Sequence, residues 1–226
     1  MPPSFDKDKR NIVIFNSALE EFEGFPEWKA VLYDKEQDIL KQIFTYFQKN
    51  EDFFFYFRIH PNLQNLNNTQ MRELKELSNL NFKNVKIIWP HEKIDSYALL
   101  DACEKVVTFG STLGVEACFW GKPSILIGRA YYEDLDCCYI PKSTDETIQL
   151  LKKDLSPKSN QGALAYGYWF DKFAISFDRF SPSYMNSDCN YWKDQIVPNL
   201  KLKDKIAIRF WWRMNNLKKY FAGKSK

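Results

Sequence analysis

The stretch KVVTFGSTLGVEACFWGKPSILIG, residues 105–128, decides the fold. Its apolar start predicts a buried strand over 106–109, and the Gly-Ser-Thr triplet at 110–112 predicts a tight turn. A short helix and a second strand follow, which is the pattern of a parallel α/β sheet. Backbone N–H groups at the start of such a helix favour a phosphate, and the two hydroxyls of the triplet add donors.

A second apolar strand ends in polar residues upstream, in the sequence FYFRIHPN at 55–62. Proline favours extended geometry in the residue before it, so we expect the His60 imidazole to point off the sheet edge ahead of Pro61. The carboxyl ends of parallel strands face the same crevice, where ligands bind. We therefore expect His60 to lie near Ser111 and Thr112. His60 could donate to a phosphate or simply close its strand, and both interpretations stay open.

Other side chains near these turns have two interpretations each. Glu116 lies one helical turn beyond Thr112 and could accept hydrogen bonds from a ribose or remain solvated. Arg58 and Arg129 are candidate phosphate partners, although a salt bridge is the more common role for such residues. His91, in the sequence WPHEK, fits a surface loop.

Strands alternate with helices along most of the chain, and this alternation predicts a Rossmann-like parallel sheet flanked by helices over residues 10–155. Asp34, Asn68 or Thr69, and a Ser143-x-x-Glu146 capping box are the candidate helix starts. The predicted strands are 11–15, 53–59, 85–88, 106–109 and 124–127.

Residues 156–226 differ in kind and predict an aromatic, helical extension that ends in a basic tail. The segment 162–180 is strongly aromatic, and 182–198 is expected to be irregular. Residues 204–221 form a helix candidate with one apolar stripe, flanked by Lys, Arg and two Trp. Such a helix could lie on an anionic membrane surface, or it could pack on another protein part.

Composition restricts the class of protein. No window approaches the roughly 18 apolar residues of a membrane span, and the first ten residues do not resemble a signal peptide. The five cysteines lack disulfide or metal spacing, so we expect a reduced, cytoplasmic chain without a metal site. Neither a P-loop, nor a G-x-G-x-x-G fingerprint, nor an H-E-x-x-H motif is present.

Charge is distributed unevenly along the chain. Residues 201–226 carry nine basic residues and one acid, a net +8, whereas the whole chain carries +3, which leaves −5 for the first 200 residues. A slightly acidic body argues against nucleic acid as a partner, and the basic tail indicates a partner of its own, such as an anionic membrane at the inner face of the cell.

In this order, the motifs FRIHPN, SYALLDACEKVVTFGSTLGVEACFWGKPSILIG and ALAYGYWFDKFAISF resemble bacterial capsule-polysaccharide glycosyltransferases of the Kdo-transferring type. The resemblance covers about residues 10–180 and corresponds to the C-terminal, donor-nucleotide half of a GT-B fold. It implies that His60-Pro61 and Gly110-Ser111-Thr112 hold the phosphate of a CMP- or other nucleotide-activated sugar. It also implies that Glu116 contacts the ribose or base, and that the donor is a substrate with no further cofactor.

In that family the acceptor site and the usual catalytic base lie in an N-terminal half that this sequence does not match. We therefore expect a fragment of a longer protein, a chain that works with a separate N-terminal half or as a homo-oligomer, or a domain that only binds. Catalytic residues stay unknown, and the chain alone is not expected to transfer sugar. The alternatives to a transferase half are a non-catalytic nucleotide-sugar-binding or assembly module and, with weaker support, an epimerase.

Overall fold

The computed structural model describes residues 5–21, 28–173, 180–182, 189–192 and 195–198. The chain divides into two compact units, Met1–Lys172 and Phe173–Lys226. The first unit therefore extends past residue 155, where the sequence places the end of the α/β domain. The boundary between functional domains stays a prediction.

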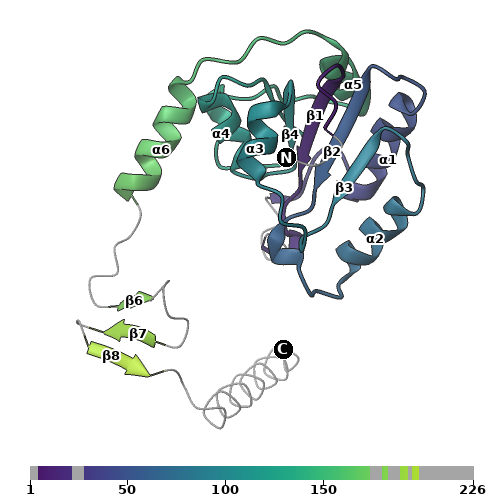
Figure 1. Ribbon diagram of the computed structural model, residues 1–226. Coiled ribbons are helices and arrows are strands. Elements are labelled where there is room, and N and C mark those ends of the chain that lie inside the picture. Colours follow the sequence, from purple (N-terminus) through teal and green to yellow (C-terminus); the bar gives the residue numbers. More distant parts are fainter. Residues whose placement is uncertain (1–4, 22–27, 174–179, 183–188, 193–194, 199–226) are drawn as a thin grey trace, which may run out of the picture. The chain divides into compact units, whose positions relative to one another are not determined.

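A five-stranded sheet forms the centre of the first unit (Figure 1). Its strands are β1 (Arg10–Phe15), β2 (Phe53–Arg58), β3 (Val85–Ile88), β4 (Lys105–Thr108) and β5 (Ser124–Leu126). All neighbouring strands are parallel, in the order β3-β2-β1-β4-β5. The predicted Rossmann-like α/β class is confirmed, with every predicted strand within two residues of its place.

Alternating residues of β1 show why the sheet is covered on both faces. Ile12 and Ile14 pack into one buried cluster, whereas Val13 and Phe15 pack into another. All four are at most 2% exposed. Side chains of a strand alternate between faces, so a continuous apolar run requires a helical layer on each side.

Helices supply the two layers (Figure 1). The first cluster receives α1 (Glu36–Phe47), α2 (Thr69–Ser78) and α5 (Thr144–Lys152). The second receives α3 (Ser96–Ala102) and α4 (Leu113–Phe119). Helix α6 (Gln161–Phe173) follows and, through Lys172, belongs to the same unit.

Two predicted helix starts are confirmed and one is wrong. The Asn68 side chain accepts a hydrogen bond from the Met71 N–H, and Ser143 accepts one from the Glu146 N–H. Helix α1 instead follows Lys35, whose side chain makes no capping hydrogen bond. Asp34, the predicted cap, forms an ion pair with Lys29, with 3.2 Å between Nζ and Oδ1.

The second unit contains a small antiparallel sheet of β6 (Phe180–Pro182), β7 (Cys189–Trp192) and β8 (Gln195–Pro198). The expectation that 182–198 is irregular is therefore wrong, because β7 and β8 pair over four residues each. The candidate helix at 204–221 and the basic tail lie outside the described residues. Within the described part of the chain, no helix has the length and apolar content that crossing a membrane requires.

Candidate functional site

The strand order creates a crevice beside β1. Chain connections leave the ends of β1 and β4 toward opposite edges of the sheet, and ligands of open α/β sheets bind at such a point. A cavity of about 250 Å3 lies there. Six of the residues predicted from the sequence line it: Arg58, His60, Pro61, Ser111, Thr112 and Glu116.

His60 is held at this edge by its backbone and by its ring. Its N–H donates to Asn16 Oδ1 at 2.7 Å, which ties the end of β2 to the end of β1. Its ring Nδ1 accepts from the Asn62 N–H at 3.2 Å. A neutral imidazole that accepts at Nδ1 carries its proton at Nε2, so the other ring nitrogen is a donor.

Arg58 brings a guanidinium to the same cavity. It is 6% exposed, and its Nη1 donates to the Trp89 carbonyl at 2.6 Å. Its Nε atom is buried and has no hydrogen-bond partner within the described residues. Burial lowers the pKa of Arg58, yet a guanidinium keeps its proton in proteins. An anion in the cavity would therefore lie beside a cation.

The turn after β4 is fixed from within. Gly110 has φ +128°, a region that side chains rarely enter. The Ser111 carbonyl accepts from the Gly114 N–H at 3.0 Å, and Ser111 Oγ lies 3.4 Å from the Leu113 nitrogen. Two of the N–H groups expected to be available for a phosphate are thus used inside the turn. The Thr112 side chain is exposed and caps nothing, so its hydroxyl remains at the surface of the cavity.

Tyr132 supports this turn through a hydrogen bond that no sequence pattern predicts. The Tyr132 side chain is 1% exposed, and its hydroxyl donates to the Ser111 carbonyl at 2.5 Å. The same hydroxyl oxygen lies 3.3 Å from Thr108 Oγ1. Burial raises the pKa of Tyr132 well above its usual value, so the phenol stays protonated and keeps donating. Tyr132 therefore helps to hold the Ser111 backbone in its position at the cavity.

We expect Tyr132→Phe to lower the free energy of unfolding by about 1 kcal/mol, because the Ser111 carbonyl loses one of its two donors and keeps only the Gly114 N–H. Urea denaturation measures the change. Tyr139→Phe is the matched control, since the Tyr139 hydroxyl also donates to a carbonyl, that of Ser156, but in an exposed position. An equal loss in both variants would contradict the role assigned to Tyr132.

Glu116 and Arg129 are each bound by a neighbouring side chain. The Tyr97 hydroxyl donates to Glu116 Oε2 at 2.6 Å, which orients the carboxylate at the cavity wall. Arg129 forms an ion pair with Glu133 at 2.6 Å, with both side chains partly exposed. The salt-bridge interpretation of Arg129 is therefore confirmed.

A buried polar cluster lies next to the strand ends and was missed by the sequence analysis. Gln70 Nε2 donates to Glu36 Oε2 at 3.0 Å and to the Ser17 carbonyl at 2.8 Å. Burial raises the pKa of Glu36 to about 8, and the hydrogen bond from Gln70 opposes that shift. Asn16 and Ser17 directly follow β1, so polar residues at a strand end were the available signal.

Metal ligands do not gather anywhere in the described part of the chain, where no group of three or more His, Cys, Asp or Glu could hold an ion. Among the described side chains, four cysteines are free thiols in buried positions: Cys103, Cys118, Cys137 and Cys138.

These features define a Rossmann-like domain with an anion-suited crevice at its topological switch point. Residues 30–135 match the model of the family described as Capsule polysaccharide biosynthesis protein. The matched range includes His60, Ser111, Thr112 and Glu116. No curated protein matches the chain.

Several solved structures are similar to this chain. UDP-GlcNAc 2-epimerase from Neisseria meningitidis bound to UDP-GlcNAc is 15% identical, with a TM-score of 0.48 over 76% of this chain and 47% of that one. Thermosulfurimonas dismutans KpsC, a beta Kdo 2,7 transferase, is 17% identical, with a TM-score of 0.46 over 96% of this chain and 57% of that one. The S. aureus MnaA–UDP structure is 13% identical, with a TM-score of 0.47 over 74% and 45%. The chain spans about half the length of these structures.

Proposed function

We propose that this chain is the donor-nucleotide-binding half of a glycosyltransferase that makes bacterial capsular polysaccharide, with a CMP- or other nucleotide-activated sugar as donor. The observation that carries the proposal is the single cavity that collects Arg58, His60, Ser111 and Thr112 at the strand ends. The match of residues 30–135 to a capsule polysaccharide biosynthesis family supports the same conclusion.

Each group in the cavity has a role that its chemistry permits. The Nε2–H of His60, the Arg58 guanidinium and the Ser111 and Thr112 hydroxyls would donate to the phosphate oxygens of the donor. Glu116 would accept hydrogen bonds from ribose hydroxyls. When the bond from sugar to phosphate breaks, negative charge grows on the leaving nucleotide, and donors fixed in place stabilise it.

Replacing His60 by alanine is expected to weaken binding of CMP, or of UMP if uridine is the preferred base, by about 1–3 kcal/mol. This is the range for hydrogen bonds to a charged group. Isothermal titration calorimetry measures the change. His91→Ala is the matched control, because His91 is the only other histidine of the chain and lies exposed in the loop after β3. Equal affinities of wild type and His60→Ala would refute the phosphate role.

A non-catalytic nucleotide-sugar-binding or assembly module is the second candidate, because the residues of the cavity suit binding a phosphate better than activating an acceptor hydroxyl. The two functions separate in a turnover assay with nucleotide-sugars and lipid-linked acceptors, performed on the chain with and without a candidate N-terminal half. Product formation supports the transferase, and binding without product under both conditions supports the module. A cytoplasmic location beside the membrane fits either candidate.

A further inference from the structure

A second and larger cavity adjoins the first. Its volume is about 640 Å3, and it lies among α3, α4 and α6, within the first unit. Tyr97, Thr112 and Glu116 line both cavities. A ligand whose phosphate occupies the first cavity would therefore lie next to the second.

The position of α6, which forms the far wall, is fixed by close contact. A Cβ atom added to Gly162 would lie 2.0 Å from the Leu135 carbonyl oxygen, so only glycine permits this approach. Tyr166 makes an edge contact with the Tyr132 ring, at 5.8 Å between centroids. The residue that supports the Ser111 turn thus also contacts the wall of the second cavity.

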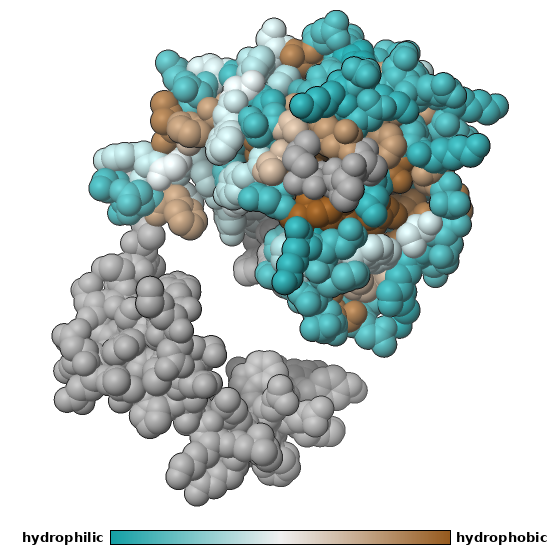
Figure 2. Space-filling view, in the orientation of Figure 1, coloured by the Kyte–Doolittle hydropathy of each residue, from teal (hydrophilic) through white to brown (hydrophobic). Residues whose placement is uncertain are grey.

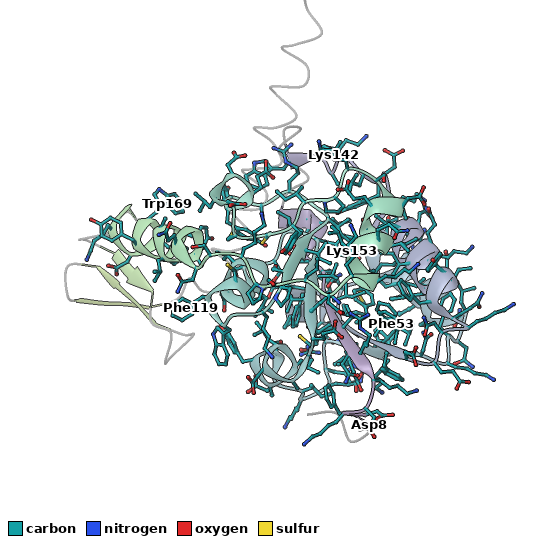
Figure 3. All side chains as sticks on the ribbon, turned by 90° about the horizontal axis from the view of Figure 1, so that it is seen from above. Asp8, Phe53, Phe119, Lys142, Lys153 and Trp169 are labelled. Carbon is teal, nitrogen blue, oxygen red and sulfur yellow. The ribbon has the colours of Figure 1, made fainter. Side chains whose placement is uncertain are left out.

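The lining of the second cavity is mainly aromatic. Six aromatic residues line it: Tyr97, Phe119, Trp120, Tyr166, Tyr168 and Phe170. Tyr97 and Trp120 stack at 6.0 Å with 25° between their planes, and about half of each side chain is exposed. Figure 3 shows Phe119 and Trp169 at the same end of the molecule, and Figure 2 shows hydrophobic side chains at the surface of α6. Exposed aromatic faces of this kind suit a flat or ring-shaped ligand.

Charge distinguishes the two cavities. Two carboxylates, Glu116 and Asp171, line the second cavity, and its described lining contains no Lys, Arg or His. Asp171 is paired with Lys172 at 2.8 Å, so Glu116 supplies most of the negative character. Glu116 also lines the first cavity, but there it is accompanied by Arg58 and His60, and neither of these two residues lines the second cavity. An anionic group is favoured in the first cavity and disfavoured in the second.

We propose that the second cavity holds the neutral, polyhydroxylated ring of the donor sugar and excludes sugars that carry a carboxylate. This inference rests on the proposed function. The ring would place its C–H face on Tyr97 and Trp120, and its hydroxyls would donate to the carboxylates and bond to the tyrosine hydroxyls. An acidic sugar such as Kdo would bring its carboxylate against Glu116 in a partly enclosed space, where like charges repel more strongly than in water.

Two other occupants fit the lining less well. A lipid chain would press apolar surface against two carboxylates and several phenol hydroxyls, and only Val115, Ala163 and Leu164 offer aliphatic contacts. A nucleobase could stack on the same rings. In that case Trp120→Ala would weaken binding of the bare nucleotide as well as binding of the nucleotide-sugar.

The test compares ligands that differ in one group. UDP, UDP-glucose and UDP-glucuronate, and the corresponding cytidine compounds, are titrated into the purified chain by calorimetry. Glucose and glucuronate differ only in a carboxylate at C6. We expect UDP-glucose to bind more tightly than UDP. We expect UDP-glucuronate to bind at least about tenfold more weakly than UDP-glucose, which corresponds to about 1.4 kcal/mol. Glu116→Gln should narrow the gap between the two sugars, and Asp171→Asn should narrow it less.

Trp120→Ala should lower the affinity for the glucose compound about fivefold to tenfold, on the scale of aromatic stacking, and leave the bare nucleotide within twofold. Tyr46→Ala, an exposed aromatic on α1 outside both cavities, is the control and should change neither. Equal affinities for UDP-glucose and UDP-glucuronate would overturn this inference and leave the proposed function intact. If Trp120→Ala lowers the affinity for the bare nucleotide as much as the affinity for the glucose compound, the second cavity binds the nucleoside. That result also overturns the inference. If no nucleotide binds, the proposed function fails and the inference fails with it.

Discussion

Glu36→Gln is expected to remove a large part of the pH dependence of folding between pH 5 and 8. Glu36 is 3% exposed, and burial raises the pKa of its carboxyl in the folded chain to about 8, above its ordinary 4.5. The folded state therefore holds a proton that the unfolded state releases over this range. Because the unfolded state binds fewer protons, stability falls as pH rises from about 4.5 to 8.

The size of this effect follows from the shift. One pKa unit corresponds to about 1.4 kcal/mol, so the wild type should lose on the order of 4 kcal/mol across the window, relative to the variant. Glutamine keeps a side-chain oxygen that can accept from Gln70, and it does not titrate. The gain in stability of Glu36→Gln over wild type should thus grow with pH and be largest at pH 8.

Urea denaturation at pH 5, 6, 7 and 8 measures this difference. Asp38→Asn is the matched control, because Asp38 is an exposed acid in the same first turn of α1. The Asp38→Asn curve should run parallel to wild type across the window. Parallel curves for Glu36→Gln and wild type would show that Glu36 is already ionised in the folded chain.

The fold could be predicted from the sequence because its strands are short, apolar and separated by helical periodicity. A buried parallel strand such as 11–15 needs no partner to be recognised, since both of its faces are hydrophobic. Caps with strong local chemistry, such as Asn68 and Ser143, were also found. The cap predicted at Asp34 is wrong: Asp34 pairs with Lys29, and Glu36, the first residue of α1, is buried beside Gln70, a contact across 34 residues that no local pattern predicts.

The candidate site could be predicted only where its residues follow strand ends. His60 and Ser111 lie next to the sheet edge by topology, so their shared cavity follows from the strand order. Tyr132 and the wall formed by α6 could not be found this way. Tyr132 reaches Ser111 across 21 residues, and Tyr166 reaches Tyr132 from another helix. Nothing in the local sequence around either tyrosine specifies those distances.

Gly110→Ala is expected to destabilise the chain strongly and to abolish the proposed nucleotide binding. At φ +128°, any side chain strains the backbone by about 1–3 kcal/mol. A Cβ atom there would also lie 2.7 Å from the Arg129 carbonyl oxygen, and crowding against fixed backbone costs about a further 1–3 kcal/mol. Relief of this strain requires the turn to move, and the turn also carries Ser111 and Thr112.

Gly121→Ala separates strain from crowding, because Gly121 also has positive φ, at +69°, but no atom lies within 4 Å of its added Cβ. We expect this control to lose about 1–2 kcal/mol, the cost of a left-handed conformation, and to bind nucleotide like wild type. Thermal denaturation and calorimetry on both variants give the comparison. Suppose Gly110→Ala is no less stable than Gly121→Ala and binds equally well. The turn after β4 would then tolerate displacement, and the close approach of Gly110 to Arg129 could not be what holds Ser111 at the cavity.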